Sequence, residues 1–320
     1  MFNYAISKKF MKQITNSILM ISPVNFRGNE QTAINNYYQN TFNNSSFHNI
    51  QQNALVEFNN LVDKLKSAGV NVIVIRDTNE LDTPDSIFPN NWVSFHDNGK
   101  IVLYPMFAKN RRKERRQDIL DFLVDYHNFR IEEIKDFTNF ENYNKYLEGT
   151  GSMVLDRENK ICYAAISIRT AEDIVIKFSN DFGYKSVCFV ANQDFHGDRK
   201  PIYHTNVMMC VTDKFAVICL DAIDDKRERE YVVKMLNKTG KEIIEITQEQ
   251  KHRFAGNMLQ VMGDRSYLVM SSSAFNILSN RQIKAIQKYC PIIHSPLDTI
   301  EAFGGGSARC MMAEIFLPKE

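Results

Sequence analysis

The sequence FGGGSARCMMAEIFLP, residues 303–318, decides how the rest of the chain is interpreted. Three consecutive glycines, Gly304 to Gly306, lower the steric barrier to close backbone approach, and an apolar run of strand length follows them. We therefore expect Cys310 at the point where a flexible turn enters a buried strand. A cysteine there is either a nucleophile at the mouth of a pocket or a buried structural thiol, because free cysteines are often buried.

A repeated unit precedes this terminal segment. A small polar residue opens an apolar strand, and a charged turn, a second strand, a helix pattern and a third strand follow. The unit begins at Asn16, Asn91, Gly151, Asn206 and Asn257. The helices are predicted over residues 54–68, 115–127, 170–183, 225–238 and 282–289, and the third strands over residues 70–75, 129–134, 185–190, 242–246 and 292–295.

Five such ββαβ units predict a ring. One unit cannot bury both faces of its sheet, whereas units stacked side by side can. The strand left over at residues 310–317 would complete the first unit and spare it an exposed edge. The expected fold is therefore α/β, a five-bladed α/β propeller with pseudo-fivefold symmetry. Residues 1–13 are expected to form a loose N-terminal leader and residues 14–320 a single catalytic domain.

Composition narrows the function. The chain has 39 basic and 38 acidic residues, a net charge of +1, which suggests neither a nucleic-acid nor a membrane partner. The basic run at residues 111–116 opens a predicted helix and is interpreted as a solvated helix face. Six cysteines form no CxxC pair, so we expect reduced thiols in a cytoplasmic protein without a metal or cofactor. No segment has the apolar length needed to cross a bilayer.

A closed ring would bring the segments that precede the first strands to one central pocket. These segments are residues 85–91, 148–151, 204–206 and 304–310. Cys310, His204 and an acid gathered there would supply covalent thiol catalysis, in which the histidine acts first as acid and then as base. Glu148 would orient His204. Taken singly, His204 could be a surface residue and Glu148 a solvated carboxylate.

Two further residues are candidates for substrate binding. Asp85 could hold a cationic substrate through charge-assisted hydrogen bonds, or it could cap a loop. Arg309 could bind a substrate carboxylate or stabilise the thiolate, or it could be a salt-bridged residue at a strand end. Arg27 and Arg169 are weaker candidates for the carboxylate.

The ordered set of motifs resembles the pentein superfamily of guanidine-modifying enzymes. It comprises the fivefold ββαβ order, PDSIF at residues 84–88 with the following Asn-Asn, the Glu148-Gly149 turn, His204 and GGGSARC at residues 304–310. The branch that the chain resembles most is the arginine deiminase-related, citrulline-utilisation type of hydrolase, often labelled amidinotransferase. The resemblance implies that Cys310 attacks a guanidinium or ureido carbon. It further implies that His204 protonates the departing amine and then activates water, that Glu148 positions His204 or the substrate, and that Asp85 binds a substrate nitrogen.

The chain departs from the superfamily at positions where other members carry acids. Asn90 and Asn91 follow the Asp85 loop, and Asn206 lies two residues after His204. An amide both accepts from N–H and donates to a carbonyl, whereas an ionised acid only accepts. We therefore expect these three asparagines to bind the substrate and to tolerate a neutral ureido group such as that of citrulline, or a substituted guanidine.

Two alternatives to this hydrolase remain open from the sequence. The same intermediate would make an amidinotransferase if an amine rather than water resolved it. The ring could also be a non-catalytic module that binds amino acids or a protein. A papain-like hydrolase is disfavoured, because His204 precedes Cys310. The expected partners are a small amino-acid substrate and, optionally, further copies of the chain.

Overall fold

Short apolar runs separated by charged turns form small sheets. The computed structural model describes residues 12–39, 47–78 and 80–319, which contain five three-stranded sheets and one two-stranded sheet. The three-stranded sheets are β17 (Ala313–Glu314), β1 (Ser17–Ser22) and β2 (Asn71–Arg76); β3 (Val93–Phe95), β4 (Lys100–Leu103) and β5 (Glu133–Asp136); β6 (Val154–Asp156), β7 (Ile161–Ala165) and β8 (Lys185–Phe189); β11 (Met209–Val211), β12 (Phe215–Ile218) and β13 (Glu242–Glu245); and β14 (Leu259–Met262), β15 (Ser266–Ser271) and β16 (Ile292–Ser295). The fold is mixed α/β.

The pairing within the sheets follows the predicted ββαβ order. In each sheet the first two strands are antiparallel and the third is parallel to the second, as in β11, β12 and β13. In the first sheet β17 takes the first place, because Glu314 pairs with Ile18 while β1 runs parallel to β2. The prediction that the last strand completes the first unit is thus confirmed.

The last strand is much shorter than predicted. The expected strand at residues 310–317 is reduced to Ala313–Glu314. The backbone before it curls, because Cys310 N donates to Ser307 O at 2.9 Å and Met312 N donates to Arg309 O at 3.3 Å. Cys310 therefore lies in a turn ahead of the strand rather than at its first position. The strand was predicted too long because an apolar run alone does not distinguish a buried turn from a buried strand.

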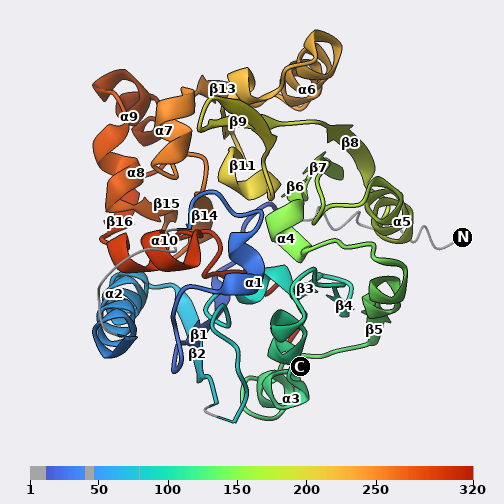
Figure 1. Cartoon of the computed structure of the whole chain (residues 1–320), viewed down its shortest axis with the longest axis vertical. Helices are drawn as coiled ribbons and strands as arrows, with labels where there is room; N and C mark the ends of the chain where they lie inside the picture. Colours follow the sequence, from blue (N-terminus) through green and yellow to red (C-terminus); the bar gives the residue numbers. More distant parts are fainter. Residues whose placement is uncertain (1–11, 40–46, 79, 320) are drawn as a thin grey trace, which may run out of the picture.

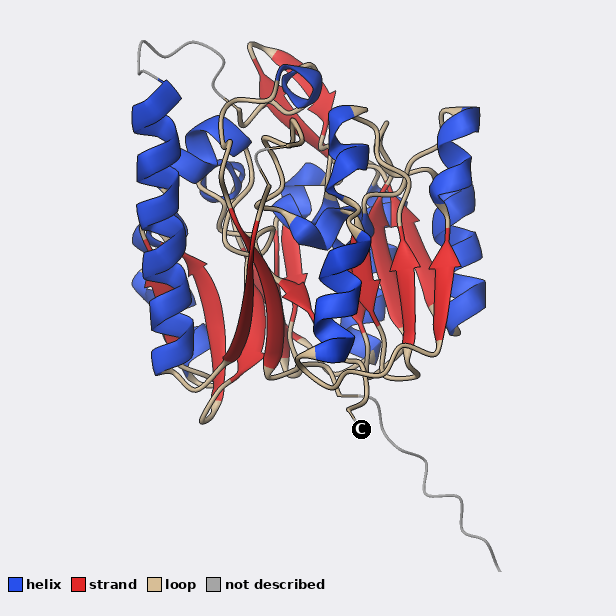
Figure 2. Ribbon diagram, turned by 90° about the horizontal axis from the view of Figure 1, so that it is seen from below, coloured by secondary structure: helices blue, strands red, loops and turns tan. Residues whose placement is uncertain are grey.

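Helices lie outside the sheets (Figures 1 and 2). The longer ones are α2 (Phe47–Ser67), α3 (Gln117–Asp125), α5 (Glu172–Phe182), α6 (Lys226–Lys238) and α9 (Asn280–Gln287). Their ends follow local chemistry: Asp225 accepts from Arg227 N at the start of α6, and Ser279 forms a capping box with Gln282 at the start of α9. The second helix begins two residues later than predicted, since Arg115 and Arg116 lie before it.

Two of the short helices, α1 and α4, lie near the centre of the view in Figure 1. The short helices are α1 (Glu30–Ala33), α4 (Gly149–Ser152), α7 (Gln248–His252), α8 (Ser272–Ile277) and α10 (Asp298–Gly304). None of these five was predicted, because a helix of one or two turns has no detectable period. They matter because α4 and α10 immediately adjoin the predicted site segments.

Apolar side chains pack between the sheets and the helices. Among the described residues these side chains form four buried clusters. In one of them, Ile174 and Phe178 of α5 cover Tyr184 and the sheet residues Cys162 and Ala164. One face of each helix is thereby buried against a sheet, and the segments between the strands are left to form the candidate site.

One hairpin lies outside the repeat. β9 (Asn192–Phe195) and β10 (Asp198–Pro201) pair with each other and join no three-stranded sheet. His196 and Gly197 between them have φ of 51° and 84°, as a two-residue hairpin turn requires. This hairpin was not predicted from the sequence, because its strands are polar and lack an alternating apolar face.

The beginning of the chain bears on the predicted leader. Residues 1–11 of the predicted leader 1–13 lie outside the described residues. Gln13, within the predicted leader, is buried, and its amide nitrogen donates to Leu155 O at 2.9 Å and Val211 O at 3.1 Å. Gln13 is therefore packed against the sheets, although it was predicted to belong to the loose leader. Within the described ranges, no helix has the length and apolarity to cross a membrane.

Candidate active site

Three of the four principal candidate residues line one buried cavity. Cys310, His204 and Asp85 come from different units of the repeat, yet all three border it. The lining is completed by Thr32, Asn36, Phe88, Asn91, Arg111, Arg169, Tyr203, Gly304, Gly305 and Gly306. Its free volume of about 10 Å³ is room for roughly one water molecule. The predicted convergence on one pocket is therefore present, and the pocket is narrow.

Glu148 lies directly behind His204. Its Oε2 is 2.7 Å from His204 Nε2, and Arg169 Nη1 lies 3.5 Å from the same oxygen. Burial alone would raise the pKa of Glu148, but the positive charge of Arg169 and the hydrogen bond with His204 outweigh it and hold the pKa below its ordinary value. The carboxylate is therefore ionised and fixes the imidazole orientation.

Burial acts on the histidine in the opposite direction. It lowers the pKa of His204 to about 4, although Glu148 partly opposes this shift. The imidazole is consequently neutral at pH 7. Its ring packs so closely on α4 that a Cβ added to Gly151 would lie 2.8 Å from His204 Nδ1 and 2.4 Å from Asn91 Nδ2. A side chain at position 151 would therefore displace the imidazole or the Asn91 amide.

Two amide groups face the sulfur of Cys310. Asn206 Nδ2 lies 3.4 Å and Asn257 Nδ2 3.2 Å from Cys310 Sγ. The expectation that Asn206 belongs to the site agrees with this geometry. Asn257 was missed as a site residue, although it begins the fifth repeat unit as Asn206 begins the fourth. Equivalence of position in the repeat was the signal that could have identified it.

Asp85 is almost fully buried, and only one of its two carboxylate oxygens accepts hydrogen bonds. Its Oδ2 accepts from Asn29 Nδ2 at 2.7 Å and from Thr32 Oγ1 at 3.3 Å, while Oδ1 has no hydrogen-bond partner. Asn206 Oδ1 is likewise buried and without a partner. Burial raises the pKa of Asp85, and Arg111 opposes that shift. Two unused acceptors near one cavity suit a ligand that carries N–H groups.

The two asparagines after the Asp85 loop differ in position. Asn91 lines the cavity, and its Oδ1 accepts from Arg111 Nη1 at 2.8 Å. Asn90 stands one layer behind, where its Oδ1 accepts from Asn91 Nδ2 at 3.0 Å and its Nδ2 donates to Thr150 Oγ1. Asn90 thus supports Asn91 rather than facing the cavity, which corrects its expected contact with substrate.

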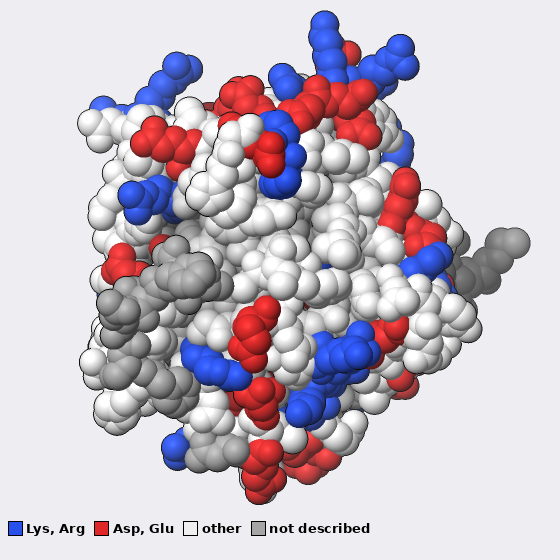
Figure 3. All heavy atoms as spheres, viewed as in Figure 1, with Lys and Arg blue, Asp and Glu red and all other residues white. Residues whose placement is uncertain are grey.

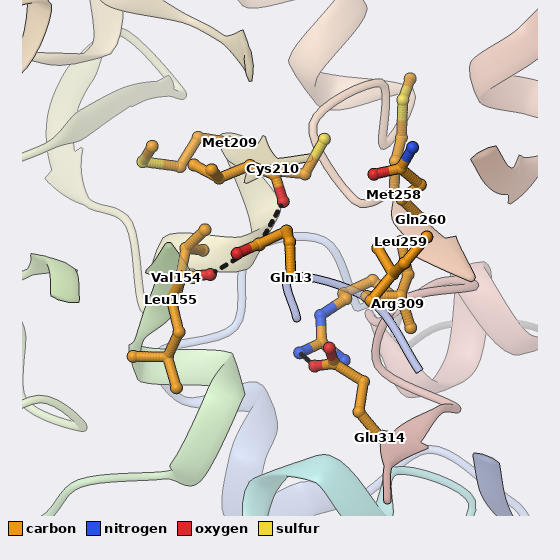
Figure 4. Close-up of a pocket in the computed structure, with 12 residues that line it drawn as sticks. Gln13, Val154, Leu155, Met209, Cys210, Met258, Leu259, Gln260, Arg309 and Glu314 are labelled. Carbon is orange, nitrogen blue, oxygen red and sulfur yellow. Dashed lines mark hydrogen bonds and ion pairs between the residues drawn. The ribbon is translucent and has the colours of Figure 1, made fainter. Parts of the chain in front are cut away.

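Arg309 points away from this cavity. Its guanidinium donates to Glu314 Oε2 at 2.8 Å and to Met312 O at 2.8 Å. Figure 4 shows Arg309 beside Glu314 in a second cavity that Gln13 also lines. The expectation that Arg309 binds a substrate carboxylate is therefore wrong in this structure, and the alternative of a salt-bridged residue describes it. Adjacent residues point to opposite sides of a turn, which the sequence alone does not reveal.

The other two arginine candidates, Arg27 and Arg169, differ in whether they line the cavity. Arg27 is partly exposed and pairs with Asp82 at 2.9 Å, outside the cavity. Arg169 is 1% exposed, lines the cavity and donates to Thr32 O at 2.9 Å and to the side chain of Asn35. Of these two, Arg169 is the arginine that can meet a substrate carboxylate.

Arg111 was misjudged from the sequence. The basic run was interpreted as a solvated helix face, but Arg111 is 2% exposed in the 3-10 helix Asn110–Glu114. Its Nε donates to Glu114 Oε1 at 2.8 Å and lies 3.8 Å from Asp85 Oδ2. Glu114, three residues later, was the available signal of an internal ion pair.

The segment of residues 29–39, which includes α1, covers the cavity. Asn36 Nδ2 donates to Gly304 O and Gly305 O, each at 3.3 Å, and Gln39 Nε2 donates to Phe303 O at 2.6 Å. Gly305 has φ of 60°, and a Cβ there would lie 2.4 Å from Asn36 Nδ2. The glycine turn and the covering segment therefore fit each other closely.

Charge on this face is mixed. Figure 3 shows acidic and basic side chains interspersed, with no large area of one sign. In the described part of the chain no group of three or more His, Cys, Asp and Glu side chains could hold a metal ion. All six cysteines are free.

Comparisons with known proteins agree with the mixed α/β fold. The family described as N,N dimethylarginine dimethylhydrolase, eukaryotic, matches residues 22–317. No curated protein matches the chain by sequence. Among solved structures, the arginine dihydrolase ArgZ from cyanobacteria superposes with a TM-score of 0.72 at 17% identity, over 95% of this chain and 41% of that one. This chain therefore spans less than half of full-length ArgZ.

Two further structures correspond in length. A variant of the N-terminal domain of ArgZ, covalently bound to a reaction intermediate, gives a TM-score of 0.70 at 18% identity over 94% of this chain and 99% of that one. A dimethylarginine dimethylaminohydrolase variant bound as an adduct to S-methyl-L-thiocitrulline gives 0.60 at 13% identity over 93% and 99%. These structures share the fold of this chain. The chain belongs to the N,N-dimethylarginine dimethylhydrolase family.

Proposed function

We propose that the protein hydrolyses a C–N bond of the guanidino or ureido group of an arginine- or citrulline-like amino acid. Cys310 is the nucleophile and His204 the general acid and base. One observation above all supports this proposal: Cys310, His204 and Asp85 border one buried cavity, and Glu148 lies 2.7 Å from His204. Arg169, at the same cavity, receives the substrate carboxylate.

Catalysis begins when His204 takes the thiol proton of Cys310. The sulfur attacks the planar carbon, a C–S bond forms and the C=N π electrons move to nitrogen. Protonated His204 then donates to the departing amine, and the C–N bond breaks. Because burial lowers the pKa of His204 to about 4, its protonated form is a strong acid and donates readily. An S-alkylthiouronium of Cys310 remains.

Water completes the cycle. Neutral His204 removes a proton from a water molecule as the oxygen attacks the thiouronium carbon. The C–S bond then breaks, its electrons return to sulfur, and a ureido product leaves. One water is consumed and one amine is released. An amine in place of water would make the enzyme an amidinotransferase, which addition of an amino-acid acceptor to the assay would reveal as a new guanidino product.

The asparagines around the sulfur favour a second candidate, hydrolysis in two rounds. Asn206 and Asn257 each direct an N–H group at Cys310 Sγ. Amide donors can also bind the carbonyl oxygen of a ureido group, whereas an ionised acid would repel it. The ureido product of the first round could then be attacked again, releasing ammonia, carbon dioxide and an amine.

The remaining features of the proposal concern the whole chain. We propose that the five three-stranded sheets form a closed five-bladed propeller and that residues 14–320 are one catalytic domain. Pairing of β17 with β1 supports the closure. We further propose a cytoplasmic protein, consistent with six free cysteines. Sedimentation analysis of the purified chain would reveal whether copies associate.

A substrate panel tests the function. Arginine, methylated arginines, agmatine and citrulline are each incubated with the enzyme, and ammonia, amine and ureido product are measured. The proposal predicts turnover of at least one guanidino amino acid and a loss of at least about 1,000-fold in Cys310→Ser. Ammonia release from citrulline would favour two rounds. Efficient turnover of arginine without turnover of citrulline would show that hydrolysis stops after a single round. Turnover retained by Cys310→Ser would overturn the proposal.

A further inference from the structure

We propose that Glu301 is a positioning residue for Cys310, acting through Ser307. This inference rests on the proposed role of Cys310 as the nucleophile. Glu301 lies in α10, outside the cavity, and none of the roles assigned above involves it.

A chain of hydrogen bonds connects Glu301 to the nucleophile. Glu301 Oε1 accepts from Ser307 Oγ at 2.5 Å, and Ser307 O in turn accepts from Cys310 N at 2.9 Å. Ser307 is fully buried and Glu301 is 7% exposed. The glycine turn at residues 304–306 has little intrinsic stiffness, because glycine populates many backbone conformations. The hydrogen bond between Glu301 in α10 and Ser307 spans this turn. It therefore fixes the position of Ser307 and, through the Ser307 carbonyl, the position of Cys310.

The surroundings of Glu301 do not favour a purely stabilising role. In the described ranges the carboxyl takes part in no ion pair with a Lys, Arg or His side chain. The charged groups that act on it are acidic, Asp298 of α10 and Glu57 of α2, and the remaining partners are the hydroxyls of Ser271 in β15 and Ser307. A buried carboxyl without a cation costs stability. Its presence is explained if it holds the turn.

Burial raises the pKa of Glu301 to about 7, and the two serine hydroxyls partly oppose the shift. The carboxyl therefore ionises near neutral pH. A hydrogen bond to an ionised acceptor is stronger than one to a neutral acceptor. We expect the Ser307 bond, and with it the placement of Cys310, to tighten as pH rises through 7.

Thiol reactivity provides the test, because it needs no substrate. Iodoacetamide labelling of Cys310 is followed by peptide mass spectrometry between pH 6 and 8.5 for wild type, Glu301→Ala, Glu301→Gln and Ser307→Ala. We expect Glu301→Ala and Ser307→Ala to label Cys310 about tenfold more slowly and to lower kcat with little change in KM. Glu301→Gln keeps an acceptor for Ser307 but cannot ionise. It should match wild type at pH 6 and fall severalfold below it at pH 8.

Glu57→Gln is the matched control. Glu57 accepts from Thr299 N at 2.8 Å and Ile300 N at 3.0 Å, so it caps the beginning of α10 without touching the glycine turn. This variant should lower the melting temperature and leave the labelling rate at pH 8.5 unchanged, while the rise in labelling moves to lower pH because the Glu57 charge no longer raises the pKa of Glu301. An equal loss of labelling in Glu57→Gln would reduce Glu301 to a stabiliser of the helix.

The outcomes separate this inference from the proposed function. Wild-type labelling of Cys310 no faster than that of the other five cysteines would contradict the nucleophile itself. Fast wild-type labelling with wild-type rates in Glu301→Ala and Ser307→Ala would overturn the positioning role alone. If Glu301→Ala fails to fold, Ser307→Ala, which removes one hydroxyl, still decides the matter.

Discussion

At the scale of single residues, amides take the places around the nucleophile where a carboxylate could stand. Asn206 and Asn257 direct N–H groups at Cys310 Sγ, and Asn206 Oδ1 has no partner. An amide can therefore serve a substrate with donors or with a carbonyl. Specificity between guanidino and ureido groups should depend on this amide.

We predict that Asn206→Asp shifts preference toward guanidino substrates. An ionised carboxylate attracts a guanidinium and repels a ureido carbonyl, so the ratio of kcat/KM for arginine over citrulline should rise at least about tenfold. The ratio is informative even if both rates fall through loss of the amide contact with sulfur. A ratio unchanged within twofold would show that Asn206 does not set specificity.

A second residue-scale prediction concerns Lys251. Its side chain is fully buried, and in the part of the chain that the structure describes its Nζ has one hydrogen bond, to Gln193 Oε1 at 3.3 Å, and no ion pair. Burial lowers the pKa of Lys251 to about 8. Replacement by Met removes a buried ammonium whose only polar or ring contacts among the described residues are this hydrogen bond and the Tyr38 ring at 5.8 Å, so Lys251→Met should raise the free energy of unfolding at pH 7 by about 1–3 kcal/mol.

The pH dependence of this effect has a defined sign. Between the folded pKa of about 8 and an ordinary value of 10.5, the unfolded chain binds more protons at Lys251 than the folded chain. Wild-type stability should therefore rise across this window, and denaturant titrations of Lys251→Met should lack that rise. Equal slopes for the two proteins would contradict the burial of a charged lysine.

At the scale of elements, sequence and structure agree where a pattern repeats and differ where contacts between distant segments decide. The helices and strands of the repeat were predicted to within a few residues in most units. The interior position of Arg111 was not, because its burial depends on Glu114 and Asp85 lying on the same side of a packed loop. The covering segment 29–39 was also invisible, since its polar residues acquire their role only against the glycine turn.

We predict that this covering segment moves when substrate enters. The cavity has room for roughly one water molecule, far less than an amino acid occupies. Hydrogen exchange of peptides within residues 29–39 should be faster in the free Cys310→Ser variant than in the same variant saturated with substrate. Peptides from α6 provide a control remote from the cavity. Identical exchange in residues 29–39 with and without bound substrate would contradict a movable cover.

At the scale of the whole molecule, the two ends of the described chain meet. β17 pairs with β1, and Glu314 of β17 is the acid for the buried Arg309 and Arg157. The repeat made this closure predictable, because one strand was left over at the end. The direction of Arg309 was not predictable, since it depends on how tightly the turn before β17 curls.

Removal of the last strand should therefore be costly. A chain ending at Met312 loses β17 and leaves two buried arginines without Glu314, so its melting temperature should fall by about 5 °C or more. A chain ending at Pro318 keeps the strand and is the control. Equal melting temperatures of the two truncated chains would contradict a structural role for the closing strand.

The central claim is that distant segments gather to make Cys310 a covalent catalyst, and one measurement tests it most directly. His204→Asn is mixed with a substrate identified in the panel, quenched in acid and analysed by intact and peptide mass spectrometry. Because His204 acts in both half-reactions, this variant should form the thiouronium adduct slowly and hydrolyse it more slowly still, so that after prolonged incubation the adduct is found on the peptide that contains Cys310. An adduct on any other residue, or undiminished turnover in this variant, would contradict the account.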